Sequence, residues 1–347
     1  MIRLLLTVPG ALVGVALSLP ALILALPFWL VRWAVCRFDK FRTPETTPKN
    51  ELIQYDSVLG WKPKPGVRAH LLIEGDGVYA VGTDEEGWPL GGANRLDDAE
   101  LVVIGDSFAF GYGANPGERF IDFLQDVPMK AFGAPGFDMV QELRVLQELG
   151  PKLRGKLVVW LVYVENDIAE SVRPHWLGYR KPFVKKPAGA EAWSLVHSHL
   201  SPEPWRASGE GRGLADFAEL CTPGPYSDRL YSACEHLVRE GAASCRAAGA
   251  QGLIVVSVPN MNQLEREGAE TLRGLSPDPN AFDVQYPHRR LEEICAAAGV
   301  RHVSGLEHFE ATHYKRFERF HWNPLGHRQA AQLLRSIYRE RDRASAS

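Results

Sequence analysis

The sequence predicts an α/β domain built on a parallel sheet with helices on both faces. Short, uninterrupted apolar runs have the length and composition of strands buried on both sides. Stretches with helical spacing separate these runs, and strands that alternate with helices form parallel sheets. The expected strands are 101–104, 130–132, 156–164, 252–258 and 300–303, and the expected helices are 118–125, 139–149, 228–248, 289–298 and 325–340.

Composition indicates an ordinary globular protein. Of the 347 residues, 45% are hydrophobic and 23% are charged, which suits a chain that buries a core. The net charge of −3 gives no basic excess to neutralise phosphates, so nucleic acid is not an expected partner. The five cysteines include no CxxC pair, and no His/Asp/Glu cluster shows metal-ligand spacing, so neither a metal nor another cofactor is expected.

The first part of the chain, residues 1–42, is predicted to be a membrane anchor. The stretch from Leu4 to Val31 carries no charge, and as a helix it would extend about 40 Å, beyond the ~30 Å hydrocarbon core. Phe28, Trp29 and Trp33 resemble an interfacial aromatic belt. A cleaved signal peptide is the alternative, but the stretch is long for one and lacks a clear cleavage site.

The cell (inner) membrane is the expected location, and the side on which the remaining chain lies stays open. Basic residues follow the apolar stretch in greater number than they precede it, which favours a cytoplasmic domain. Pro9, Pro20 and Pro27 give another alternative, in which the segment kinks and re-enters instead of crossing.

Residues 43–98 are predicted to form a linker and a strap. A first part rich in Pro and Thr has no apolar period, and 55–66 is punctuated by Pro and Gly. Alternation between about Ala69 and Val81 predicts a short hairpin. The main domain is expected over 99–340, with an insertion at about 171–226.

Functional residues are expected just after the strands, because ligands collect at the carboxyl ends of parallel strands. Ser107 follows the first strand in the sequence Gly-Asp-Ser-Phe and is the candidate nucleophile. A serine hydroxyl is a poor nucleophile until a base takes its proton, so a histidine is required elsewhere. Taken alone, the motif fits a turn with an N-cap serine equally well.

The ends of the second and third strands supply candidate oxyanion donors. Gly136 lies in the loop after the second strand, where a glycine lets a backbone N–H approach a ligand. Asn166 follows the third strand, and its amide could donate a second hydrogen bond. In isolation, a plain turn at Gly136 and a helix cap or Asx-turn at Asn166 explain these residues better.

His321 is the candidate base. It stands just before Pro324, which suits the first turn of the last helix, and so it is expected on a loop at the active edge of the sheet. Glu318 precedes it closely enough to orient the imidazole through Nδ1–H. His327 is expected to be a structural residue within the helix.

The order of these four blocks resembles that of the SGNH (GDSL-like) hydrolases. Ser107 matches the block I serine, and Gly136 matches the block II glycine in the sequence GAPGFDMVQEL. Asn166 matches the block III asparagine and His321 the block V histidine. The resemblance covers about residues 99–340 and implies a flavodoxin-like three-layer α/β/α sandwich.

Two positions depart from the family pattern. Glu318 stands where the family usually has Asp, and Val164 replaces the glycine of Gly-x-Asn-Asp. A glutamate can orient the histidine with one extra methylene. An acid on another loop and a bare Ser–His dyad remain alternatives.

The resemblance implies a serine mechanism. His321 would deprotonate Ser107, which attacks an ester carbonyl. The N–H groups of Ser107 and Gly136 and the amide of Asn166 would hold the oxyanion. Water, or a sugar hydroxyl, would then release the acyl group.

The expected function is that of a membrane-anchored serine esterase or O-acyltransferase. Its acyl-ester substrate would be a glycan or lipid-linked molecule, the acyl group acetyl, and a membrane acyltransferase a candidate partner. Lipase or lysophospholipase activity is an alternative, as is a non-catalytic carbohydrate-binding scaffold. The family resemblance favours a periplasmic domain, against the charge bias.

The insertion offers two interpretations. Its part over 171–213 has more Lys and Arg than Asp and Glu, and it carries Trp176, Tyr179, Trp193 and Trp205. These rings could pack a solvated loop. They could instead belong to a lid that stacks on sugars or sits at a lipid interface, and both interpretations stay open.

Overall fold

The computed structural model describes residues 46–47, 51–93, 95–176, 178–187, 189–190, 192–203 and 213–344. The chain divides into two compact units, Met1–Glu45 and Thr46–Ser347, and the description below concerns the second. The predicted anchor lies outside the described residues. Among those that are described, no helix combines the length and the apolar character needed to cross a membrane.

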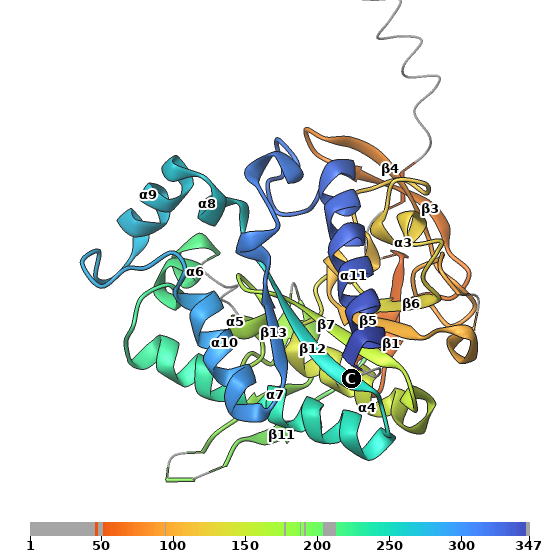
Figure 1. The fold of residues 1–347 in the computed structure, drawn as a ribbon. Coiled ribbons are helices and arrows are strands. Elements are labelled where there is room, and N and C mark those ends of the chain that lie inside the picture. The colour runs from red at the N-terminus through yellow and green to blue at the C-terminus, as the bar shows by residue number, and fades with distance from the viewer. Residues whose placement is uncertain are drawn as a thin grey trace, which may run out of the picture. The chain divides into compact units, whose positions relative to one another are not determined.

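A five-stranded parallel sheet forms the centre of this unit (Figure 1). Neighbouring strands pair in parallel, in the order β13-β12-β7-β5-β6. Numbered along the chain within the sheet, this order is 2-1-3-4-5, as in flavodoxin. The strands are β5 (Leu101–Gly105), β6 (Met129–Gly133), β7 (Leu157–Tyr163), β12 (Gly252–Val258) and β13 (Arg301–Ser304).

Helices cover both faces of the sheet and make three layers. Side chains of a strand point alternately to opposite faces, so Val102 and Ile104 of β5 join one core while Leu101 and Val103 join the other. The first core packs under α4 (Met139–Leu149), α7 (Pro225–Ala248) and α10 (Tyr286–Ala298). The second packs under α2 (Ser107–Phe110), α3 (Phe120–Phe123) and α11 (Pro324–Ala344). The predicted α/β sandwich is thus confirmed.

Two antiparallel hairpins precede the sheet. The first joins β1 (Ile53–Asp56) to β2 (Gly60–Pro63), and the second joins β3 (Arg68–Ile73) to β4 (Gly77–Gly82). The second confirms the hairpin predicted from alternation. Its inward-facing side chains pack against Phe110 and Tyr112, which follow the first sheet strand.

Two expectations about secondary structure are wrong. The helix expected over 118–125 is only the single turn α3, which ends before Leu124. The insertion is not irregular, because it contains two short hairpins and a helix. These are β8 (His175–Trp176), β9 (Tyr179–Arg180), β10 (Phe183–Lys185), β11 (Ser194–Val196) and α6 (Leu214–Leu220). Short helices also follow two strands: α5 (Asp167–Glu170), α8 (Met261–Leu264) and α9 (Arg266–Leu275).

Candidate active site

Ser107 stands at the carboxyl end of β5, near the middle of the sheet. It is the first residue of α2, so its N–H has no partner inside that helix. Asp106 caps the helix, accepting a hydrogen bond from the Phe108 N–H through Oδ1 at 2.9 Å. The serine is 6% exposed. Its hydroxyl is therefore held at the sheet edge where ligands bind in this class of fold.

Ser107, His321 and Glu318 form a continuous set of hydrogen-bonded side chains. The Nε2 atom of His321 lies 2.8 Å from Ser107 Oγ. On its other side, His321 Nδ1 contacts Glu318 Oε1, and the His321 backbone N–H donates to Glu318 Oε2 at 3.1 Å. A proton on Nδ1, held by Glu318, leaves Nε2 as the acceptor for the serine proton.

The charge of Glu318 suits this arrangement. Burial alone would favour the neutral carboxyl. The hydrogen bonds from the ring and the backbone N–H of His321 outweigh that effect and lower the pKa of Glu318 below its usual value. Glu318 is therefore a carboxylate at neutral pH.

A tight turn holds Glu318 and His321 in position. Arg319 between them has a φ of 64°, and it is the one non-glycine residue with positive φ in the described part of the chain. A residue in this left-handed conformation persists only where its surroundings fix it. Here the Arg319 side chain pairs with Glu265 at 2.6 Å, and the Glu318 N–H donates to Asp76 Oδ2 at 2.8 Å.

Gly136 and Asn166 lie on opposite sides of Ser107, because β5 pairs with β6 on one edge and with β7 on the other. Gly136 has a φ of 83°, and a Cβ there would come within 2.5 Å of the Trp176 ring. None of the described residues accepts a backbone hydrogen bond from its N–H. The Asn166 amide oxygen is buried without a partner among the described residues. Of these two groups, the Gly136 N–H is a donor that the surrounding backbone does not use.

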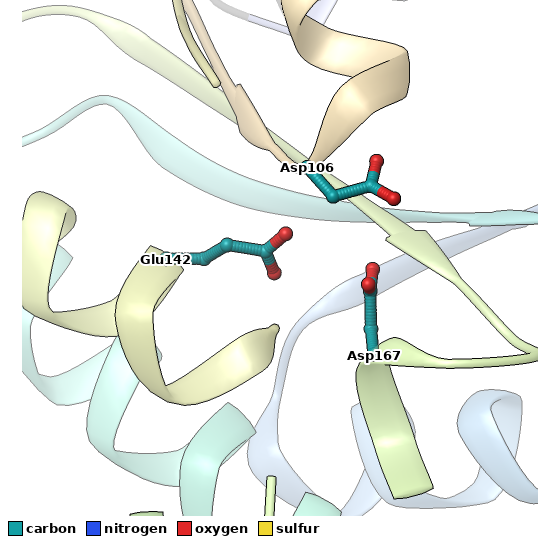
Figure 2. Close-up of side chains that lie close together, drawn as sticks. All are labelled: Asp106, Glu142 and Asp167. Carbon is teal, nitrogen blue, oxygen red and sulfur yellow. The ribbon is translucent and has the colours of Figure 1, made fainter. Parts of the chain in front are cut away.

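Three buried acids, Asp106, Glu142 and Asp167, lie close together next to the nucleophile in the chain (Figure 2). Carboxyl oxygens of Asp106, Glu142 and Asp167 all lie within 4.8 Å of one another. Asp106 Oδ2 also lies 3.2 Å from Ser107 Oγ, which links this acid cluster to the nucleophile. The Trp160 indole N–H donates to Glu142 at 2.7 Å.

Burial raises the pKa of all three acids. Burial raises the pKa of Asp106 to about 6. Burial, reinforced by the negative charge of neighbouring acids, raises the pKa of Glu142 and of Asp167 well above the usual value. None of the three forms an ion pair within the described residues. Glu142 and Asp167 are therefore neutral at pH 7.

The sequence shows no metal-ligand spacing, so it did not predict the acid cluster. Its members come from three separate segments, so no local pattern joins them. The spacing would suit a divalent cation, which prefers carboxylate oxygens. However, each carboxyl already accepts a hydrogen bond from a protein donor. The second oxygens of Glu142 and Asp167 are buried without a partner among the described residues.

Burial distinguishes His321 from other histidines near serines. Ser257 Oγ lies 2.8 Å from His288 Nδ1 and 2.9 Å from His302 Nε2, but Ser257 is fully buried. Burial lowers the pKa of His288 to about 3 and that of His302 to about 4, so both are neutral packing residues. His327 is also buried, and burial lowers its pKa to about 3, in keeping with its predicted structural role.

The chain is similar to several solved structures. No family model matches the chain, and no curated protein matches it. A putative arylesterase from Agrobacterium tumefaciens is 13% identical, with 70% of this chain and 99% of that chain covered at a TM-score of 0.42. A carbohydrate acetylesterase family member from Sinorhizobium meliloti is 14% identical, with 70% and 98% covered at 0.40.

The aryl esterase of M. smegmatis is similar at the same level, with 12% identity, 70% of this chain and 99% of that chain covered, and a TM-score of 0.40. The roles assigned to individual residues below rest on the hydrogen bonds of the site itself.

Proposed function

We propose that this protein is a serine hydrolase of ester bonds, or a related O-acyltransferase, in which Ser107 is the nucleophile and His321 the base. The observation that carries the proposal is the contact of 2.8 Å between Ser107 Oγ and His321 Nε2, on a ring whose other nitrogen contacts the Glu318 carboxylate. A nucleophile, a base and an orienting acid in this geometry are the parts of a serine triad.

The chemistry follows in two halves. His321 Nε2 takes the proton of Ser107 as Oγ bonds to the ester carbonyl carbon. The tetrahedral intermediate collapses to an acyl-serine, and the leaving alcohol takes the proton from His321. An acceptor hydroxyl then attacks the acyl-serine while His321 takes its proton. When Ser107 leaves, that proton returns to Oγ.

Gly136 and Asn166 would stabilise the tetrahedral intermediate. Its oxyanion would accept hydrogen bonds from the N–H groups of Ser107 and Gly136 and from the Asn166 side chain. The Gly136 N–H, which has no backbone acceptor among the described residues, supports this role, because a donor already used by the fold could not turn to the oxyanion without loss.

The acceptor decides between the two versions of the activity. Water as acceptor gives an esterase, and a glycan hydroxyl gives an O-acyltransferase. The uncharged stretch from Leu4 to Val31 supports a substrate near a membrane, either a glycan or a lipid-linked molecule, and a membrane acyltransferase as partner.

The experiment is hydrolysis of p-nitrophenyl esters by the full-length protein beside its Ser107→Ala variant. Loss of the nucleophile is expected to lower kcat by about 10⁴-fold or more, with the fold retained by circular dichroism. Turnover without added acceptor supports the esterase, and turnover that needs a sugar acceptor supports the transferase. If both proteins bind a glycan alike and neither turns over any ester, the non-catalytic scaffold replaces this proposal.

A further inference from the structure

An apolar cavity of about 340 Å³ lies between the N-terminal hairpins and the loops that follow β5 and β6. Cavities of this size hold small ligands in other proteins. Of the described side chains that line it, none is charged, and Thr83, Tyr112, Trp176 and Tyr179 alone carry a polar atom. Its apolar walls include Val67, Leu71, Val81, Phe110, Pro135 and Trp176.

The cavity shares its walls with the candidate active site. Phe110 ends the helical turn that Ser107 begins. The Tyr112 ring lies 4.7 Å from the His321 ring, measured between centroids. Trp176 packs so closely on Gly136 that a Cβ there would lie within 2.5 Å of the indole. Two residues of the cavity wall, Tyr112 and Trp176, thus contact the base and the candidate oxyanion loop.

The lining favours one of the two groups that an ester substrate could place in the cavity, a sugar or an acyl chain. A sugar would lose its hydrogen bonds to water and find few partners, which is costly in an apolar site. A hydrocarbon chain would gain free energy with every methylene that it buries. The walls therefore suit the acyl side of an ester rather than a sugar.

We infer that this cavity holds the acyl chain of the substrate, so that the enzyme acts on medium-chain acyl esters rather than on acetyl esters alone. The inference rests on the proposed serine chemistry. It departs from the acetyl group expected from the sequence, and it brings the substrate nearer to that of a lipase or lysophospholipase.

A series of p-nitrophenyl esters from acetate to octanoate tests the inference on the full-length protein. The value of kcat/KM is expected to rise by up to about fourfold for each added methylene until the cavity is full. Val67→Trp should then fill the cavity from a half-buried position outside the core clusters. It is expected to lower kcat/KM for octanoate at least tenfold and to change the value for acetate less than twofold.

Leu72→Trp is the matched control. Leu72 lies on the same hairpin, is 57% exposed and does not line the cavity. The same large side chain there should leave the chain-length profile unchanged. A Ser107-dependent activity that is flat from acetate to octanoate, or that responds alike to Val67→Trp and Leu72→Trp, overturns the inference and leaves the proposed function standing.

A binding measurement keeps the inference testable if no ester is turned over. The fluorescence of cis-parinaric acid, a fatty acid that emits in apolar surroundings, would report binding to the Ser107→Ala protein, with decanoate as the competitor. Binding that Val67→Trp abolishes and Leu72→Trp preserves supports the acyl-chain cavity even though the serine chemistry has failed. Equal binding by both variants, or none by Ser107→Ala, overturns it.

Discussion

Two sets of carboxyl groups flank Ser107, and they differ in charge state. Glu318 is an anion because the hydrogen bonds from His321 lower its pKa. The acids of the cluster beside the serine form no ion pair within the described residues, and burial and mutual repulsion keep Glu142 and Asp167 neutral. Environment, more than residue type, thus assigns the role of each carboxyl group.

The two sets of carboxyl groups also have different expected roles, one in catalysis and one in stability. An anion beside the imidazole stabilises the positive charge that develops when His321 takes a proton. Neutral carboxyls beside Ser107 can donate and accept hydrogen bonds without opposing the negative charge of the oxyanion. We therefore expect changes to Glu318 to alter the rate, and changes to the acid cluster to alter mainly the stability.

Glu318→Gln removes the carboxylate beside His321 and should have the largest effect on kcat/KM. A neutral amide cannot stabilise the imidazolium, and it can hold the wrong tautomer of His321. We expect kcat/KM to fall by about 10²–10⁴-fold in the p-nitrophenyl ester assay. Glu318→Asp keeps the charge with a shorter reach and should recover part of the loss. A Gln variant with nearly full activity would show a Ser–His dyad instead.

Asn166→Ala tests a candidate oxyanion donor that is next to the acid cluster in the sequence. Asn166 precedes Asp167 of the acid cluster, but its side chain does not cap α5. Loss of one oxyanion donor is expected to lower kcat by about 10²–10³-fold with KM nearly unchanged, because the bond forms only in the transition state. A rise in KM at constant kcat would instead assign Asn166 to ground-state binding.

The sheet and the order of the site residues along it could be predicted because their signals are local. Continuous apolar runs gave all five strands within a residue or two, and the helix at 139–149 has the expected bounds. The α3 turn is shorter than expected, since apolar spacing alone does not show where a helix ends. The hairpins of the insertion are too short to produce a clear alternating pattern.

Features that depend on tertiary packing could not be predicted in this way. The acid cluster joins residues from three segments, and the one available signal was Glu142 on the same helical face as Met139 and Leu146. An acid on an apolar face indicates a buried carboxyl but not its partners. The cavity likewise depends on how residues 52–83 pack against the loops beside Ser107.

Glu142→Gln tests the neutral acid cluster and should have the smallest effect on the rate. Because the folded-state pKa of Glu142 is raised, the folded protein keeps a proton that the unfolded chain loses above about pH 4.5. The associated stability is present below that pH and is lost as the pH rises toward the folded-state pKa, at up to about 1.4 kcal/mol per pH unit. Glutamine does not titrate, and it can still accept from Trp160.

We therefore expect the free energy of unfolding of Glu142→Gln, relative to the unmodified protein, to improve by about 1–3 kcal/mol between pH 4.5 and pH 8 in urea titrations, with kcat within a few-fold. Glu267→Gln, at an exposed position on α9, is the control and should show no such change. An unchanged pH slope would mean that Glu142 is ionised in the folded protein. Stabilisation by Mg²⁺ or Ca²⁺ that this variant abolishes would assign the acid cluster to a cation, because only ionised carboxylates would bind one.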